Sequence, residues 1–306
     1  MKTQVTRNVI GAAMFSLLCL ALPAQAQRGG GGGEELKQLA AKPTPRTADG
    51  RPDLSGRWGG GDGGAGAGGA SGFKDGVHTL IFGSVIEGVD PEKDAITADS
   101  GLHGEESRKQ REARNAPEYK PELRAKREAM ATDQNHHDPT AYSCQPHGVP
   151  RMGAPAFIVQ QPDRVIFLYG SNPYSTFRMI PTDGRPHRSS AEVDQSGMGD
   201  PVGRWEGDTL VIETTGFDED STWFGRDGYF HSDAMKVTER FTRKGDTLEY
   251  QATVEDPKVL MKPFNMSPTP QVIRKGDPKA ILYNSDYPCD IEVHDFRQYA
   301  DRYNHL

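Results

Sequence analysis

Glu239 is the residue whose place in the sequence most strongly suggests chemistry. Met235, Val237, Glu239 and Phe241 alternate with polar residues along one predicted strand. Successive side chains of a strand point to opposite faces, so this alternation places the carboxylate among apolar neighbours. A buried carboxylate must be protonated or paired, because leaving it bare in an apolar environment is costly. Such a group suits a general acid or base.

The partner strand of Glu239 follows in the same hairpin. A two-residue Lys244-Gly245 turn would place Phe241 opposite Leu248 and Glu239 opposite Tyr250. A slip of one residue would set apolar side chains against polar ones, so the register is well specified. Tyr250 would then donate a hydrogen bond to Glu239. Two alternatives stay open, a structural ion pair with an arginine and a glutamate near an open barrel end.

His231 and Asp233 precede this strand in the run Phe230-His231-Ser232-Asp233. The position is a strand entrance, where the mouth of a barrel would lie. We predict that His231 assists Glu239 in catalysis and that Asp233 orients the imidazole. The alternative is a loop histidine bonded to the backbone. Ser232 is a poor candidate nucleophile, because no G-x-S-x-G motif is present.

Arg204 and Trp205 end the strand before the turn at Glu206-Gly207. Arg204 would neutralise Glu239 or hold an anionic group of a ligand. Trp205 is either a core residue or a contact for the apolar part of a ligand. With Tyr250 they form the predicted ligand-binding set, and their spacing does not decide between these roles.

Metal and cofactor motifs are weak in this sequence. His136, His137 and His147 lie close to Cys144, but none of the helical spacings typical of zinc sites occurs, so we predict no metal site. The glycine-rich tracts lack the G-x-x-x-x-G-K-[ST] ending of phosphate loops, and no dinucleotide fingerprint is present. We therefore predict no cofactor.

Many short apolar runs separated by turn residues indicate a mainly β, antiparallel fold. Strands are predicted at 157–159, 165–169 and 176–181, the second being central and buried on both faces. The phrase Gly207-Asp208-Thr209-Leu210 recurs as Gly245-Asp246-Thr247-Leu248, which marks two hairpins. A lipocalin-like barrel or a sandwich fits this pattern, and Gly56-Arg57-Trp58 favours the barrel.

The first 26 residues have the features of a secretory signal. Lys2 and Arg7 precede an apolar run from Val9 to Leu22, and Ala24-Gln25-Ala26 supplies a cleavage site. We predict a periplasmic or secreted protein with no integral membrane segment after cleavage. Loss of the two cations changes the net charge from -7 to -9 (-7 minus 2), which disfavours nucleic acid as a partner.

The composition divides the chain into four segments. Residues 1–26 are the signal, and 27–53, rich in glycine and proline, form a flexible linker. Residues 54–143 contain a first strand, a Gly-rich loop at 59–72 and surface helices at about 105–115 and 121–131. Residues 144–300 form the antiparallel barrel or sandwich. Two cysteines remain after cleavage, and in an oxidising compartment we expect a Cys144–Cys289 disulfide, with free or metal-binding thiols as the alternative.

The chain also resembles an uncharacterised family of secreted bacterial proteins. The resemblance is carried by Pro45 to Trp58, with its PDLSGxW phrase, by Cys144 to Arg151, by Val202 to Phe217 and by His231 to Phe241. His147 stands where the family pattern has a second proline, and the segment around Cys289 departs from the pattern. The resemblance implies membership and export, and it implies no activity.

Three functions remain open at this level. The first is a secreted β-barrel that holds a small, partly apolar molecule in an interior cavity, with a few polar contacts. The second is a cofactor-independent hydrolase, lyase or isomerase that uses Glu239 as acid or base together with His231. The third is a structural envelope protein with a filled core.

Overall fold

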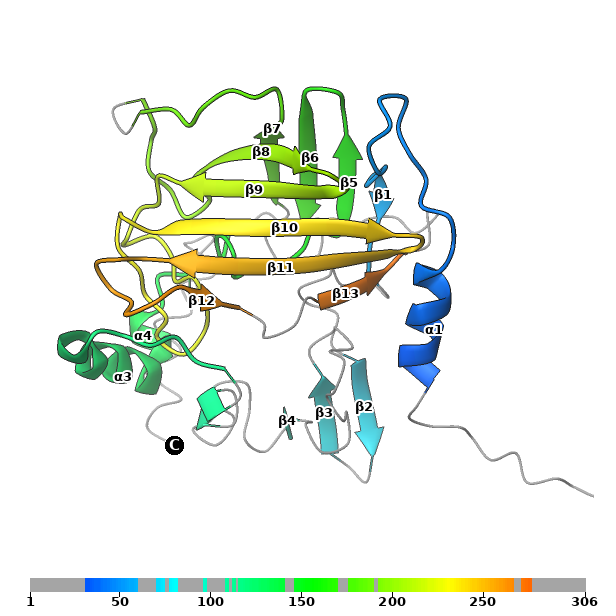
Figure 1. The fold of residues 1–306 in the computed structure, drawn as a ribbon. Helices are drawn as coiled ribbons and strands as arrows, with labels where there is room; N and C mark the ends of the chain where they lie inside the picture. The colour runs from blue at the N-terminus through cyan, green and yellow to red at the C-terminus, as the bar shows by residue number, and fades with distance from the viewer. Residues whose placement is uncertain are drawn as a thin grey trace, which may run out of the picture.

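Two antiparallel sheets dominate the computed structural model (Figure 1). The structure describes residues 31–59, 70–74, 77–81, 96–97, 108–109, 112–113, 115–140, 146–169, 176–189, 192–266 and 271–276. The expected signal at 1–26, both cysteines of the expected disulfide and most of the expected helix at 105–115 lie outside these residues. None of the helices in the described part of the chain has the length and apolar character needed to cross a membrane.

The smaller sheet has four strands in the order β1-β5-β6-β7. Their bounds are Gly56–Arg57 for β1, Phe157–Gln160 for β5, Arg164–Tyr169 for β6 and Thr176–Pro181 for β7. The predicted central strand is β6, which lies between β5 and β7. Val165 and Phe167 on its inner face are fully buried, whereas Ile166 and Leu168 on its other face are half-buried. The apolar run had predicted full burial of both faces, but only the inner face of the strand is fully buried.

The larger sheet has the order β12-β11-β10-β9-β8, with β13 also paired to β11. The strands are β8 (Asp200–Glu206), β9 (Thr209–Thr215), β10 (Lys236–Lys244), β11 (Thr247–Glu255), β12 (Phe264–Asn265) and β13 (Gln271–Arg274). Alternation along β9, β10 and β11 turns one apolar face of the sheet inward. This face contains Leu210, Ile212, Phe241 and Leu248, all fully buried.

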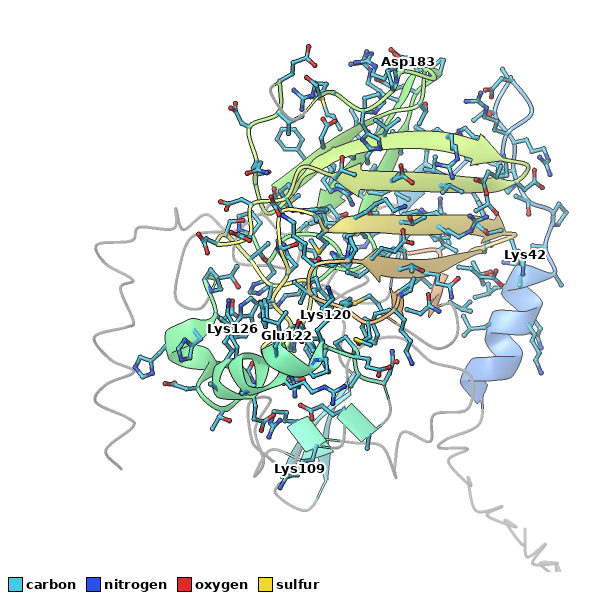
Figure 2. All side chains as sticks on the ribbon, turned by 60° about the vertical axis from the view of Figure 1, so that its left-hand side comes forward. Lys42, Lys109, Lys120, Glu122, Lys126 and Asp183 are labelled. Atoms are coloured by element: carbon cyan, nitrogen blue, oxygen red, sulfur yellow. The ribbon has the colours of Figure 1, made fainter. Side chains whose placement is uncertain are left out.

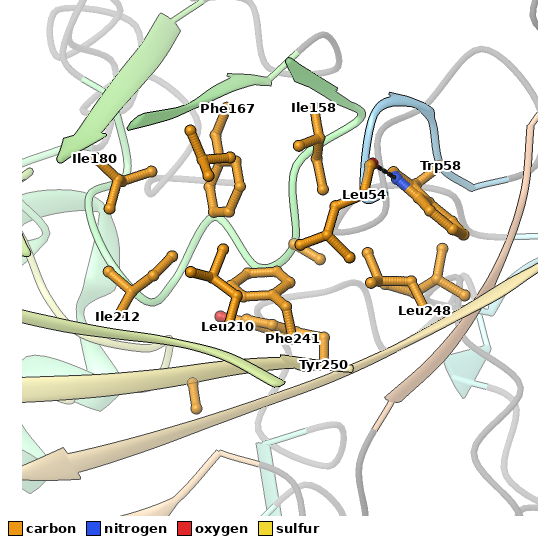
Figure 3. Packing of buried hydrophobic residues seen from close by; sticks show 14 of the residues in the cluster. Leu54, Trp58, Ile158, Phe167, Ile180, Leu210, Ile212, Phe241, Leu248 and Tyr250 are labelled. Atoms are coloured by element: carbon orange, nitrogen blue, oxygen red, sulfur yellow. Dashed lines mark hydrogen bonds between the residues drawn. The ribbon is translucent and has the colours of Figure 1, made fainter. Parts of the chain in front are cut away.

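The two sheets pack face to face as an open sandwich. Ile158, Phe167 and Ile180 of the smaller sheet meet Leu210 and Phe241 of the larger one in a single core cluster (Figure 3). Among the described strands, no pairing joins the two sheets into a closed ring. The described strands therefore form no closed lipocalin-like barrel, and the mainly β, antiparallel part of the prediction is confirmed.

Both long hairpins turn one residue later than predicted. Gly207 and Gly245 occupy the first central position of each turn with φ of 58° and 54°, a conformation that glycine adopts at little cost. The shift places Phe241 opposite Tyr250 and Glu239 opposite Ala252. The predicted pairing is thus displaced by two residues. Because two residues is one full period of a strand, every side chain keeps its predicted face.

Within the expected flexible linker at 27–53, the described residues 31–53 contain regular structure and fixed contacts. Gly31–Ala40 form helix α1, and its last turn and the segment after it bond to the end of the β10–β11 hairpin. The amide of Asp246 donates to the carbonyl of Leu39 at 3.0 Å, and Lys42 pairs with Asp246 at 2.8 Å (Figure 2). These contacts satisfy polar backbone groups that the hairpin end would otherwise leave to water.

A short helical region lies between β1 and β5 in the chain. It contains the 3-10 turn η2 (Pro121–Leu123), helix α3 (Arg124–Thr132) and helix α4 (Gln134–His137), which agrees with the surface helix predicted at 121–131. Within α3, Ala131 is the buried residue. A small antiparallel sheet of β2 (Ala70–Lys74), β3 (Val77–Ile81) and β4 (Ile96–Thr97) begins in the tract predicted to be a Gly-rich loop.

Candidate functional site

Glu239 is buried between the sheets, as its strand position predicts. Its side chain is 0% exposed, and its partner is Arg178 of β7 in the opposite sheet, 2% exposed. Arg178 Nη1 lies 2.7 Å from Glu239 Oε2 but off the direction of its N–H bonds, so the two form an ion pair without a well-aligned hydrogen bond. Of the two alternatives left open by the sequence, the geometry matches the ion pair with an arginine.

Three more side chains complete an interior polar cluster, which we define as Arg178, Glu239, Tyr169, Tyr250 and Thr214. Tyr250 donates to Glu239 Oε1 at 3.2 Å, as the sequence predicted, although it lies diagonally across the ladder. Arg178 donates to the Tyr169 hydroxyl at 3.2 Å and to Thr214 Oγ1 at 3.1 Å. All five residues are buried, so the cluster satisfies most of its own hydrogen-bonding groups away from water.

The cluster keeps its phenols and its guanidinium protonated. Burial raises the pKa of Tyr169 to about 12, with nearby Glu239 acting in the same direction against Arg178. Burial also raises the pKa of Tyr250 well above its usual value. For Arg178 burial acts to lower the pKa, but Glu239 and Tyr169 outweigh it and the pKa is raised. The arrangement is therefore a fixed charge pair held by neutral donors.

The raised pKa of Tyr169 predicts a loss of stability in alkali. The tyrosine pKa is near 10 in the unfolded chain and about 12 in the folded protein. Its contribution to the stability of the fold is therefore fully present below pH 10 and is lost as the pH rises towards 12. We expect the free energy of unfolding to fall by roughly 2–3 kcal/mol over this range because of Tyr169. Urea unfolding measured at pH 9, 10, 11 and 12 checks this expectation.

The matched variant is Tyr169→Phe, which should remove this share of the pH dependence. The comparison is needed because burial lowers the pKa of Lys275 to about 8. Between pH 8 and its ordinary pKa of 10.5, Lys275 therefore raises the free energy of unfolding as the pH rises, which opposes the effect of Tyr169. An alkaline loss of the same size in Tyr169→Phe and in the wild type would contradict the assignment.

His231 and Asp233 do not join Glu239. His231 is 3% exposed, packs against Phe217 and donates from Nδ1 to the Ser232 carbonyl at 3.0 Å, which matches the alternative of a histidine bonded to backbone. Burial lowers its pKa. Asp233 instead pairs with Lys258 at 2.5 Å on the surface, so it does not orient the imidazole. The predicted catalytic trio is therefore not assembled.

Arg204 and Trp205 also lie away from Glu239. Arg204 is 53% exposed and pairs with Glu206 at 2.9 Å, because its strand position turns it to the outer face of the larger sheet. Trp205 is half-buried against the core cluster, with the guanidinium of Arg51 5.7 Å from its ring centroid. Of the predicted ligand-binding set, Tyr250 contacts Glu239 and the other two do not.

The histidines near Cys144 are separately engaged. His136 pairs with Asp133 at 2.6 Å on the surface, and His147 bonds to Thr140 Oγ1 at 2.9 Å. Burial, followed by the charge of Arg151, lowers the pKa of His147 to about 4. Within the described ranges no group of three or more His, Cys, Asp or Glu side chains is arranged to hold a metal ion.

Arg178 is the main residue that the sequence analysis missed. Alternation in β7 sets Phe177 and Met179 on one face and Arg178 and Ile180 on the other, and the more apolar face would be chosen as the inner one. The structure does the opposite, since Phe177 is 60% and Met179 55% exposed. The available signal was Glu239 itself, because a buried carboxylate requires a cation and Arg178 lies in a strand.

A pocket of about 300 Å³ lies outside the sandwich, where β6, β7 and the loop after β7 meet the start of β8. We call it the outer pocket. Its lining combines apolar side chains with three arginines and two aspartates: Met179, Pro181, Pro186, Pro201, Val202, Arg164, Arg185, Arg188, Asp163 and Asp200. Asp183, which pairs with Arg185 at 2.5 Å, lies on the adjoining loop (Figure 2).

Comparisons with protein-family models, with curated proteins and with solved structures found no match. The resemblance to a family of secreted bacterial proteins therefore stays a prediction. The interior polar cluster and the outer pocket are the two places in the described chain whose geometry bears on function.

Proposed function

We propose that the protein is exported and binds a small, partly apolar molecule in the outer pocket. The observation that carries this proposal is the lining of that pocket, in which an apolar floor lies beside arginines with spare donors. Ligand sites of about 300 Å³ and larger, mostly apolar with a few placed polar groups, are typical of small-molecule binding.

The arginines suggest the polar part of the ligand. Arg164, Arg185 and Arg188 each use Nε and Nη2 to bind one aspartate, at distances of 2.5–3.1 Å. A guanidinium has five N–H donors, so Nη1 of each remains available for an acceptor on a ligand. The three aspartates balance the three arginines in charge. A ligand that carries one carbonyl or carboxylate group beside an apolar ring fits this balance.

The interior polar cluster gives little support to the alternative of a hydrolase, lyase or isomerase that uses Glu239 as acid or base. A general acid or base must reach its substrate, and Glu239 is fully buried between close-packed sheets with Arg178 on Oε2 and Tyr250 on Oε1. The remaining alternative is a structural envelope protein, and a failure of the binding test below would favour it.

Methyl NMR of the methionines tests the proposal with defined probes. The expected result is that benzoate, phenylacetate or cinnamate shifts the methyl signal of Met179, in the floor of the outer pocket, with saturation. The signal of Met235, which is 1% exposed in the core, should stay unchanged. Isotope labelling of methionine methyl groups in the mature protein gives both readouts in one titration.

Met179→Glu and Met261→Glu form a matched pair for this titration. Met179 and Met261 are similarly exposed, at 55% and 54%, and Met261 is not among the residues that line the outer pocket. With equilibrium dialysis of the aromatic carboxylate as the readout, binding should weaken at least tenfold in Met179→Glu and stay unchanged in Met261→Glu. Equal effects of the two, or shifts confined to Met235, would contradict the proposal.

A further inference from the structure

The two outward faces of the sandwich differ sharply in chemistry. The larger sheet presents a ladder of ion pairs, in which Glu206 binds both Arg204 and Arg240 at 2.9 Å and Lys236 binds Glu255 at 2.7 Å. This is the usual surface of an antiparallel sheet that faces water. The smaller sheet presents apolar side chains instead, and a contiguous apolar surface of this kind marks a contact site.

Six side chains make up this outer apolar face, and they stand in two rows across the strands. The ladder register aligns Phe157 with Leu168 and Phe177 in one row, and Val159 with Ile166 and Met179 in the next. Four of the six are half-buried and two are more than half exposed. Their partners on the inner side of the same strands, such as Ile158 and Phe167, are 0% exposed. The face is therefore a second apolar surface of the sheet, distinct from the core.

The described chain ends beside an edge of this same sheet. Lys275 forms a bridge with Trp58, and the amide of Gly276 donates to the carbonyl of Arg57 in β1 at 3.0 Å. Strand β1 is the edge strand of the order β1-β5-β6-β7. Residues 277–306 thus continue from a fixed point one strand away from β5, where the outer apolar face begins.

The length and composition of residues 277–306 suit this face. The segment has 30 residues (306 minus 276), and the three strand spacings from β1 to β7 amount to about 15 Å, which fewer than ten extended residues cross. Large apolar and aromatic residues are frequent in it, and they are Ile281, Leu282, Tyr283, Tyr287, Ile291, Val293, Phe296, Tyr299, Tyr303 and Leu306. Ile291 and Val293 alternate with Asp290, Glu292 and His294, the pattern of a chain with one apolar side.

We propose that residues 277–306 dock on the outer apolar face of the smaller sheet. The docked segment would bury the two rows centred on Ile166 and Leu168 and would leave its own charged side chains in water. Met179 belongs both to this face and to the lining of the outer pocket, so the docked segment would border the pocket. Docking rests on the two apolar rows and does not use ligand binding.

Site-specific photo-cross-linking in the full-length mature protein tests the docking. Phe177→p-benzoylphenylalanine keeps an aromatic ring at an exposed position and places the reactive group on the face. Arg240→p-benzoylphenylalanine, at a side chain 43% exposed on the charged face of the other sheet, is the matched control. After irradiation at low protein concentration without ligand, peptide mapping should find the main product of position 177 as an intrachain link to residues 277–306. Position 240 should give no such link.

Each other outcome would overturn the proposal. A cross-linked dimer would assign the face to a second copy of the chain, and a link to another segment would assign it to that segment. Absence of any protein product at position 177 would leave the face open to solvent. Because no ligand is present, these outcomes test the docking and leave ligand binding to the methyl titration.

Discussion

Replacing Arg178 by methionine should destabilise the protein by about 3–5 kcal/mol. The substitution preserves much of the side-chain volume but leaves the carboxylate of Glu239 buried without its cation. Tyr250 supplies one hydrogen bond, which does not offset the loss of the opposite charge. The free energy of unfolding from urea denaturation at pH 7 measures the effect.

Two further variants separate the pair from its surroundings. Arg178→Met combined with Glu239→Leu should recover most of the lost stability, because an apolar pair of similar volume replaces a buried ion pair at little cost. Arg240→Met removes an arginine from the exposed face of β10, where its ion pair with Glu206 contributes less than about 1 kcal/mol. If the single and double variants at 178 and 239 were equally unstable, the ion pair would not be the cause.

Truncating Trp58 to alanine should cost about 3–5 kcal/mol. Trp58 is 1% exposed, donates from its indole to the carbonyl of Leu54 at 2.8 Å (Figure 3), and has two cations near its ring. Arg243 is 5.3 Å and Lys275 4.4 Å from its ring centroid, so the ring joins β1 to the larger sheet and to the segment after β13. Urea denaturation and hydrogen exchange of residues 41–58 are the measurements.

Trp205→Ala provides the control for the Trp58 variant. Trp205 is half-buried at the edge of the same core, so its truncation should cost clearly less. A loss at Trp58 no larger than at Trp205 would contradict the role given to Trp58. Unchanged protection of residues 41–58 would do the same.

The sequence predicted the strands and their faces better than their closure. Alternation placed Glu239 inward and predicted β7 with its observed bounds, because the two-residue period is a local property of the chain. Whether a sheet closes into a barrel depends on pairing between distant edge strands, which no local pattern in this chain specifies. The sequence favoured the barrel through Gly56-Arg57-Trp58, and only the strand order shows that the described strands form no closed barrel.

The turns show how a local error can leave the conclusion intact. The sequence places glycine at the second turn position, and the structure places Gly245 at the first. The resulting displacement of the ladder by two residues changed which residue lies opposite Glu239 and kept its face. Tyr250 still reaches the carboxylate because a tyrosine side chain is long enough to bond diagonally.

The partner of Glu239 was beyond sequence reasoning for a different reason. Arg178 lies 61 residues earlier (239 minus 178) and in the other sheet, so the contact exists only through the packing of the two sheets. Its strand is also unusual, because the more apolar face of β7 points outward. That same inversion produces both the interior ion pair and the outer apolar face, so neither could be predicted from alternation alone.

The central claim is that a ligand binds outside the sandwich while the interior ion pair is structural. The most direct test repeats the aromatic carboxylate titration in the Arg178→Met/Glu239→Leu variant, with the Met179 methyl signal as the readout. The claim predicts saturation with a dissociation constant within about twofold of the wild type, since less than 0.5 kcal/mol should separate them. Loss of binding in a double variant that remains folded would contradict it and return the ligand to the interior.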